Sequence, residues 1–221
     1  MDILKIMKPF CVQNNELYAD MMNPYDGGDG YVYGCDNSMF IAVPETTEGI
    51  PQGLPIFQKK AALKREGCIS DACEPFLIPL KTIFDVSKKF SETEKCDECK
   101  GTGKVRYMYI DNNDEAHYKS FDCPCCNGTG LMHGNVVAIH PETKKPVSET
   151  AFVEISHEDT KLRFNLARIV IIALAAKEFG LNALEIINFG PRGAAVFRMP
   201  DGILAGLMPC IIGEVGAKIR A

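Results

Sequence analysis

Apolar positions recur at helical spacing in two parts of the chain. From Leu80 to Phe90 they form one face, with the lysines largely off it, which predicts an amphipathic helix after a strand at Phe76–Pro79. A second helix is predicted from Leu166 to Phe179, with Asn165 as its N-cap and Gly180 as its stop. Because this second helix is apolar on nearly every side, we expect it to be buried between layers.

Short apolar segments separated by turn residues predict strands. Tyr31–Gly34 and Met39–Val43 are joined by a short polar link, so we expect them to pair antiparallel. After the second helix, Gly- and Pro-containing turns separate three further segments and predict an antiparallel meander: Ala183–Ile187, Ala194–Arg198 and Ile203–Met208. Strand-like segments also occur at Asn135–Ile139 and Ala151–Ile155. A helix followed by strands in each half favours the α+β class over alternating parallel units.

Composition places the chain among ordinary globular proteins. Its 221 residues are 46% hydrophobic and 24% charged with a net charge of −5, which excludes disorder. The excess of acid lies in residues 1–131, and no polybasic run marks a nucleic-acid surface. The longest apolar run, Ile169–Ala176, is far shorter than the roughly 20 residues of a membrane span, and no signal-peptide core is present. We therefore expect a cytoplasmic, reducing location without a membrane span, where clustered cysteines indicate metal before disulfide.

The motif C-x-x-C-x-G-x-G occurs twice, 27 residues apart. Two residues between cysteines allow a tight turn to aim both sulfurs at one point, and the glycines let the backbone curl beneath the metal. Strand-like runs at Lys104–Ile110 and Ala116–Phe121 flank a polar turn, Asp111–Glu115, so a hairpin would bring the two motifs together. Four thiolates form a closed tetrahedral set, which predicts one structural Zn²⁺ on Cys96, Cys99, Cys123 and Cys126.

The other cysteines and the histidines leave alternatives open. If they bind no metal, the four motif cysteines form two disulfides or remain unligated thiols. Cys125 is a possible substitute for a neighbouring ligand. Cys68 and Cys73 are either half of another site or isolated thiols, whereas Cys11, Cys35 and Cys210 are expected in the core. His117, His133, His140 and His157 have no ligand spacing and are expected at the surface or in turns. Since no catalytic motif occurs, we expect no catalytic residues and no enzyme activity.

The doubled motif resembles the cysteine-rich zinc module of DnaJ-type co-chaperones, over about 35 residues. This chain has two repeats where that family has four, so the resemblance implies one zinc ion rather than two. No His-Pro-Asp signature of a J-domain occurs near the N-terminus. A chaperone-like role, or peptide binding through the module, is the alternative function that this resemblance implies.

The remainder of the chain resembles a sliding DNA clamp domain. The similar segments are Tyr31–Val43 for a strand pair, Phe76–Phe90 for a strand that leads into an inner helix, and Asp201–Pro209 for a last strand ending in Met-Pro. The resemblance implies helices that line a positive inner surface and contact DNA phosphates without reading bases. Because a clamp ring needs several such domains, it also implies that the chain forms oligomers or serves a different purpose. The candidate DNA contacts, which are otherwise solubilising charges, are Lys81, Lys88, Lys89, Lys161, Arg163 and Arg168.

Together these patterns predict a clamp-like antiparallel sheet with helices, interrupted by an inserted zinc-binding hairpin module. Residues 1–91 and 132–221 would form the α+β body, and residues 92–131 the module. The expected function is that of a non-enzymatic scaffold that binds DNA or proteins of a DNA-processing assembly. The zinc module would serve it as a docking surface.

Overall fold

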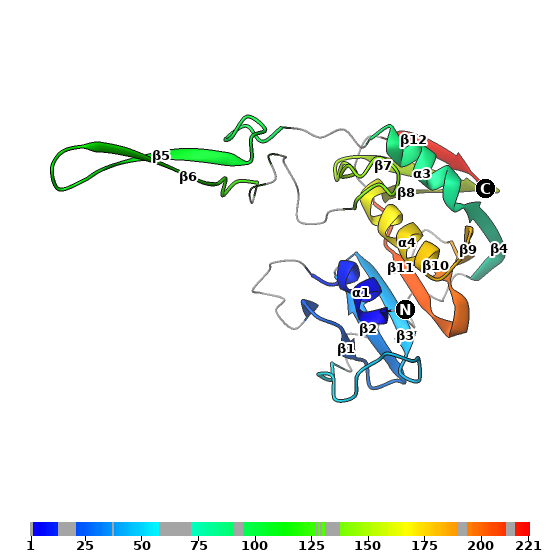
Figure 1. The fold of residues 1–221 in the computed structure, drawn as a ribbon. Coiled ribbons are helices and arrows are strands. Elements are labelled where there is room, and N and C mark those ends of the chain that lie inside the picture. Colours follow the sequence, from blue (N-terminus) through cyan, green and yellow to red (C-terminus); the bar gives the residue numbers. More distant parts are fainter. Residues whose placement is uncertain are drawn as a thin grey trace.

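The computed structural model describes residues 2–12, 21–36, 38–57, 72–90, 95–126, 128, 130, 138–189, 194–210 and 215–221. Figure 1 shows an α+β body from which a two-stranded hairpin projects. The predicted fold class, α+β with antiparallel sheets, is confirmed. Among the described residues, no helix is both long and apolar enough to cross a membrane.

In the described residues, the N-terminal part contains one short helix, one 3-10 turn and three strands. Their bounds are α1 Ile3–Met7, η1 Lys8–Phe10, β1 Tyr25–Asp26, β2 Tyr31–Cys35 and β3 Met39–Pro44. Strands β2 and β3 pair antiparallel, as predicted. Their connection is held by the carboxylate of Asp36, which accepts hydrogen bonds from the backbone N–H groups of Ser38 and Met39 at 2.6 and 2.8 Å.

A seven-stranded sheet combines strands from the N-terminal and C-terminal parts of the chain. Its order is β1-β2-β3-β11-β10-β9-β4, with every pairing antiparallel. The predicted C-terminal meander is confirmed as β9 Ala183–Asn188, β10 Ala195–Arg198 and β11 Leu204–Leu207, with the turn η3 Pro200–Gly202 between the last two. Strand β4, Ala72–Pro79, forms the far edge.

Alternation along the strands divides the sheet between two hydrophobic clusters. Met39, Ile41 and Val43 of β3 belong to the main core, whereas Phe40 and Ala42 contact the smaller cluster around Tyr25 and Tyr33. This is the period of two expected for a strand buried on both faces.

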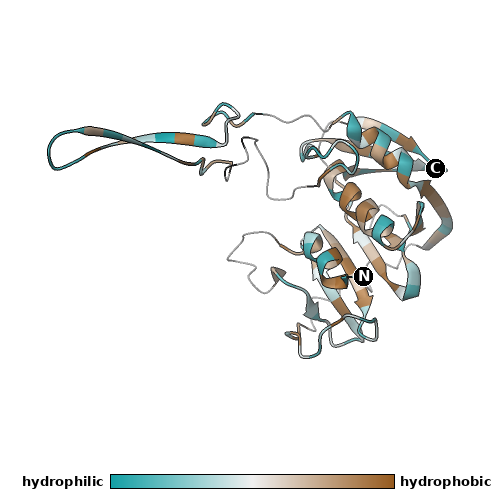
Figure 2. Cartoon of the chain, in the orientation of Figure 1, coloured by the Kyte–Doolittle hydropathy of each residue, from teal (hydrophilic) through white to brown (hydrophobic). Residues whose placement is uncertain are grey.

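The predicted helices are confirmed as α3 Leu80–Lys88 and α4 Leu166–Glu178, which pack against each other. The side-chain oxygen of Asn165 accepts a hydrogen bond from the backbone N–H of Arg168 at 3.1 Å, which satisfies one free donor at the start of α4. Gly180, at φ +79°, follows the helix in the left-handed conformation that glycine tolerates. Nine residues of α4 are buried, and the ribbon of this helix in Figure 2 has mostly the colour of hydrophobic residues.

A second sheet contains strands that the sequence pattern did not predict. Its order is β12-β7-β8, from Val215–Arg220, Phe152–His157 and Thr160–Asn165, and β12 runs parallel to β7. Only β7 corresponds to a predicted segment, Ala151–Ile155. The N-terminal part of the predicted segment Asn135–Ile139 lies outside the described residues, and Ile139 forms only an isolated bridge with Pro146.

The projecting hairpin consists of β5, Lys104–Ile110, and β6, Ala116–Asp122, in continuous antiparallel register. This confirms the predicted hairpin around the polar turn. The pairing places Lys104 opposite Asp122 and therefore brings the two cysteine motifs, which flank the strands, to the same end of the hairpin.

Candidate metal centre and basic residues

The two motifs place four buried sulfurs around one point. Each of the four cysteines is at most 5% exposed, and all four sulfurs lie within 4.8 Å of one another. The Sγ atoms of Cys96 and Cys123 are 3.8 Å apart, and those of Cys99 and Cys126 are 3.7 Å apart. A tetrahedral ion with Zn–S bonds of about 2.3 Å requires sulfurs about 3.8 Å apart, whereas a disulfide requires about 2.05 Å. The donor set fits a tetrahedral thiophilic metal and contains no disulfide.

Backbone hydrogen bonds join the two motifs in a nearly symmetric arrangement. The N–H of Cys96 donates to the carbonyl of Gly130, and that of Cys123 to the carbonyl of Gly103, both at 2.9 Å. Within each motif, a glycine N–H donates to the second sulfur: Gly103 to Cys99 and Gly130 to Cys126, both at 3.2 Å. These N–H groups stabilise negative charge on sulfur.

Two glycines allow the backbones of the two motifs to lie in direct van der Waals contact. Gly103 and Gly130 have φ of +70° and +78°. A Cβ at Gly103 would lie 2.2 Å from the carbonyl oxygen of Gly128, and a Cβ at Gly130 would lie 2.4 Å from that of Gly101. The last glycine of each motif is therefore required by conformation and by space.

The thiols divide into two pairs by acidity. Desolvation opposes ionisation of Cys99, but hydrogen bonds from the backbone N–H groups of Gly103 and Gly101 lower its pKa to about 6. Desolvation likewise opposes ionisation of Cys126, whose pKa is lowered by the N–H of Gly130. The pKa of Cys96 rises to about 12, because desolvation and hydrogen bonds with the neighbouring thiols outweigh the N–H of Cys99. Desolvation also raises the pKa of Cys123. The two low-pKa sulfurs favour a cation at the centre of the set.

The remaining described cysteines lie outside this cluster. Cys125 is exposed, whereas Cys11 and Cys35 are buried as expected and Cys73 and Cys210 are half-buried. Burial raises the pKa of Cys11 to about 12. Cys68 lies outside the described residues, so a pairing with Cys73 stays a hypothesis.

The histidines were expected at the surface or in turns, and one of them is buried. His140 is fully buried, with Nε2 2.9 Å from the carbonyl of Phe84 and Nδ1 accepting the backbone N–H groups of Glu142 and Thr143 at 3.1 Å. His140 lies at a turn, as expected, but it is not at the surface: these contacts satisfy both ring nitrogens and make burial tolerable. His117 lies at the hairpin turn, with Nε2 2.9 Å from the carboxylate of Asp111. His133 lies outside the described residues.

A second group of metal-ligating side chains lies at the hairpin turn, and no sequence motif predicted it. Ligand atoms of Asp111, Glu115 and His117 lie within 4.8 Å of one another, and none of the three is buried. Only the register of the hairpin brings His117 opposite Tyr109 and hence close to the turn carboxylates. Such exposed groups are common without a metal, and the Asp111–His117 contact accounts for this one.

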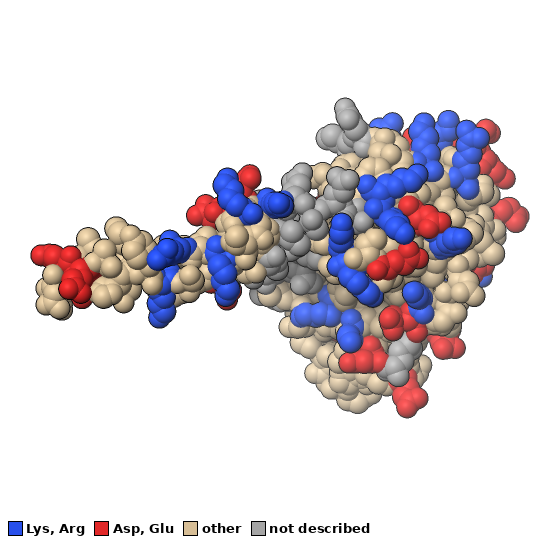
Figure 3. All heavy atoms as spheres, turned by 45° about the horizontal axis from the view of Figure 1, so that its top comes forward, with Lys and Arg blue, Asp and Glu red and all other residues tan. Residues whose placement is uncertain are grey.

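The six basic candidates fall into two groups. Arg168 forms an ion pair with Asp36, and Arg163 and Lys88 lie 3.7 and 3.4 Å from carboxylates of Glu154 and Glu142. The structure shows no ion pair between the other three candidates and any residue that it describes, and all three are exposed: Lys81, Lys89 and Lys161. Figure 3 shows lysine and arginine side chains spread over the body with acidic ones among them.

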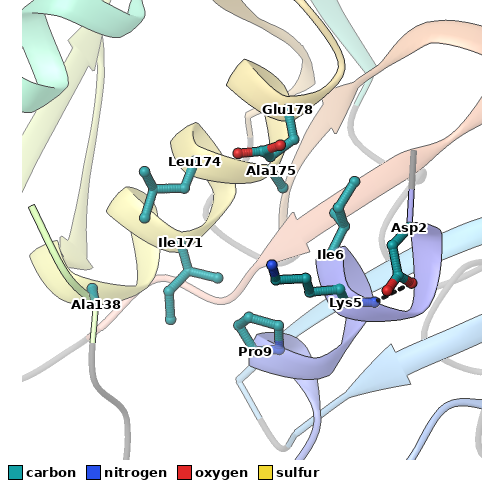
Figure 4. A pocket seen from close by; sticks show the side chains of 9 residues that line it. All are labelled: Asp2, Lys5, Ile6, Pro9, Ala138, Ile171, Leu174, Ala175 and Glu178. Atoms are coloured by element: carbon teal, nitrogen blue, oxygen red, sulfur yellow. Dashed lines mark hydrogen bonds between the residues drawn. The ribbon is translucent and has the colours of Figure 1, made fainter. Parts of the chain in front are cut away.

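A pocket of about 440 Å³ lies between α1 and α4. Figure 4 shows Ile6, Ile171 and Leu174 facing it, with Lys5 and Glu178 also in its lining. None of the candidate metal or DNA residues lines this pocket. Its wall also includes Ala138, which directly follows residues that the structure does not describe.

Comparison with known proteins gives structural matches only. No protein-family model matches the chain, and no curated protein matches its sequence. Among solved structures, a C. crescentus β sliding clamp is 9% identical, with a TM-score of 0.47, 96% of this chain covered and 63% of that chain. A DnaN sliding clamp, DNA polymerase III subunit beta, from Bartonella birtlesii is 10% identical, with a TM-score of 0.47 and 95% and 63% covered.

A third structure, DNA polymerase III subunit beta from Borrelia burgdorferi, is 10% identical, with a TM-score of 0.46 and 96% and 62% of the chains covered. This chain therefore spans less than two thirds of the length of these proteins. At these values the likeness concerns the arrangement of helices and strands alone. The mixed α+β fold with antiparallel sheets is similar to that of these sliding clamps.

Proposed function

We propose that this chain is a non-enzymatic scaffold protein of a DNA-processing assembly, with a DNA-associating body and one zinc ion at the base of the projecting hairpin. The observation that carries the zinc part of the proposal is the convergence of four buried sulfurs at tetrahedral spacing. Four thiolates leave no open coordination position, so the ion would hold the two motifs together rather than activate water.

Zinc binding would couple to the folding of the module. Apart from the four cysteines, the packed apolar cluster of the described module contains only Val105. A two-stranded hairpin is marginally stable by itself in water. Coordination would therefore supply the stabilisation that a hydrophobic core supplies elsewhere, since structural zinc sites contribute directly to folding free energy.

The placement of positive charge supports association with DNA. Lys81 lies in α3, Lys89 directly follows it, and Lys161 lies in β8, which leads into α4. These exposed ammonium groups would contact phosphates and fix the position of a duplex without reading bases. Arg168, by contrast, holds the β2–β3 connection to α4 through Asp36, so we assign it a structural role.

Salt-dependent retention of a labelled DNA duplex tests the proposal. Each phosphate contact contributes about −0.9 to the slope of log K against log salt. Lys81→Glu/Lys89→Glu should therefore reduce the magnitude of this negative slope by about two and weaken retention at least tenfold. Lys95→Glu/Lys100→Glu is the charge-matched control, because both lysines are exposed on the cysteine module rather than beside α3. Equal retention by both double variants, or no retention by the parent chain, would remove the DNA-associated role.

A chaperone-like peptide binder is the second candidate, favoured by the exposed apolar side chains of the hairpin. Under this alternative, the chain would suppress aggregation of an unfolded client, and Cys96→Ser would abolish the effect. Suppression that survives Cys96→Ser would separate that activity from the module.

A further inference from the structure

The hairpin exposes large apolar side chains along its whole length. The described part of the chain has ten large hydrophobic residues that are highly exposed, and six of them lie on β5 and β6. Contiguous exposed apolar surface of this kind marks interaction sites. The six, with exposed fractions of 45 to 61%, are Tyr107, Met108, Tyr109, Ile110, Tyr118 and Phe121.

Both faces of the hairpin contribute to this surface. Strand alternation and the register put Tyr107, Tyr109 and Phe121 on one face, and Met108, Ile110 and Tyr118 on the other. When a hairpin packs one face against the body of a soluble protein, only its other face is exposed to water, and that exposed face is normally polar. The apolar residues on both faces therefore indicate that an additional element packs here.

Contacts within the hairpin order these side chains. The ring of Tyr109 stacks on His117 with centroids 5.2 Å apart, and Tyr107 meets Phe121 edge-on at 5.8 Å. On the opposite face, the guanidinium of Arg106 lies 4.1 Å from the centre of the Tyr118 ring. Side chains already fixed in place lose little further entropy on binding.

The backbone of the hairpin offers open edges. In the described structure, β5 and β6 pair only with each other, so the outer edge of each strand presents unpaired N–H and C=O groups. An extended peptide segment satisfies such an edge by adding a strand, and its alternate side chains reach both faces.

Charge along the hairpin favours a protein over a nucleic acid. From Lys104 to Asp122 there are three Lys or Arg and four Asp or Glu, and the acidic residues gather at the turn as Asp111, Asp114 and Glu115. Figure 3 shows this acidic end of the arm. Hydrogen bonds from His117 and from the backbone N–H groups of Glu115 and Asn113 lower the pKa of Asp111, so that it stays charged. A negative tip repels phosphates and attracts lysine or arginine.

We propose that the hairpin is a docking site for an extended segment of a partner protein, which adds a strand to one hairpin edge. The segment has apolar side chains at alternate positions and Lys or Arg at the end beside the acidic turn. Tyr, Phe and Met, which account for five of the six exposed apolar side chains, are residue types enriched at such interfaces. The inference rests on the proposed function in that zinc fixes the base of the hairpin, and it specifies the partner class of the docking surface.

The experiment uses the full zinc-loaded chain and a phage-displayed library of random 12-residue peptides. Selected peptides should alternate apolar and polar residues and have Lys or Arg at one end. Synthetic copies should bind in fluorescence anisotropy, and N-methylation at alternate positions on the hydrogen-bonding side should reduce affinity at least tenfold, because it removes the donors of the added strand.

Two pairs of matched variants test the surface. Met108→Thr/Ile110→Thr keeps β-propensity while removing apolar area, and should weaken peptide binding at least tenfold. Its control is Ile139→Thr/Met208→Thr, which alters two exposed apolar residues of the body and should bind as the parent does. Asp114→Asn/Glu115→Gln should weaken binding and reduce its salt dependence, whereas Asp159→Asn/Glu158→Gln, at exposed sites in the turn between β7 and β8, should not. Zinc content and far-ultraviolet circular dichroism establish that each variant is folded.

Several results would overturn the proposal. They are selection without a consensus, equal peptide binding by Met108→Thr/Ile110→Thr, binding of a 20-nucleotide oligo-dT at the same surface in place of peptides, and self-association of the chain that this variant abolishes. The Lys81→Glu/Lys89→Glu variant separates this proposal from the DNA-associated role, because it should lose DNA retention and keep peptide binding. Peptide binding by a parent chain that retains no DNA would leave the docking site standing and refute only the DNA role.

Discussion

The contact between Gly103 and Gly128 gives a quantitative prediction for the module. In Gly103→Ala, the new Cβ would lie 2.2 Å from the Gly128 carbonyl oxygen at a φ of +70°. An alanine in the left-handed region costs roughly 1–2 kcal/mol. Backbone must also move by about 1 Å to relieve the clash, at a further cost of roughly 1–3 kcal/mol, as for other overpacked sites.

Gly101→Ala is the matched control. Gly101 has a similar φ of +88°, but its added Cβ would meet only the side chain of Lys95, at 3.1 Å, which is free to move aside. Both variants place an alanine in the unfavourable left-handed conformation, and only Gly103→Ala also has the clash with the backbone. Because the module folds around its metal, these costs reduce zinc affinity.

Zinc affinity measured by competition with a chromogenic chelator checks this reasoning. Gly101→Ala should bind zinc about tenfold more weakly than the parent chain, which corresponds to about 1.4 kcal/mol, and Gly103→Ala at least 100-fold more weakly. Equal affinities for the two variants would show that the close approach of the two motifs does not limit metal binding.

Three further predictions concern the body and two cysteines outside the metal set. Arg168→Ala should lower the free energy of unfolding in urea by about 2 kcal/mol, because it leaves the Asp36 carboxylate, whose side chain is 11% exposed, without its ion-pair partner. Asn165→Ala should lower it by about 1 kcal/mol through loss of the N-cap of α4. In the folded chain, iodoacetamide at pH 8 should modify exposed Cys125 well before Cys11, whose pKa of about 12 keeps it protonated; peptide mapping gives the order.

Each of these has a contradicting result. Lys88→Ala removes an ion pair whose side chains are 56 and 64% exposed, so it should change stability by less than about 0.5 kcal/mol; an effect equal to that of Arg168→Ala would refute the role assigned to Asp36. Asn165→Ser retains a capping oxygen and should stay near the parent, and a full loss there would exclude capping as the cause. Early modification of Cys11 would contradict its burial.

Sequence patterns predicted the elements whose determinants are local. Helix α4 has its N-cap at Asn165 and its stop at Gly180, and the hairpin has alternating β-prone residues around a polar turn. The cysteine set follows from spacing as well, because two residues between cysteines determine how closely their sulfurs approach.

Features set by distant contacts were missed. Strand β8 has alternating burial at Leu162 and Phe164, but it is short and rich in charge, so it resembled a polar link. In β12, Ile219 is the only fully buried large apolar residue, and its parallel pairing with β7 depends on residues more than 60 positions earlier. The pairing of β3 with β11, which joins the two ends of the chain, likewise has no local signal.

Side-chain partners were also beyond prediction from spacing. The sequence pattern places Arg168 among the candidate phosphate contacts, yet the fold directs it to Asp36, 132 residues away in the sequence. His140 is buried because a carbonyl of α3 and two N–H groups of its own turn surround its ring. Such partners are fixed only once the elements are packed.

Metal content of the purified chain tests the central claim most directly. Elemental analysis should find one zinc per chain in the parent and in Cys125→Ser, and far less than one in Cys126→Ser. Of these two neighbouring cysteines, Cys126 contributes one of the four converging sulfurs and Cys125 does not. The claim would be contradicted by a parent chain with far less than one zinc whose four motif cysteines become open to alkylation only after reduction. That result would replace the metal centre by two disulfides.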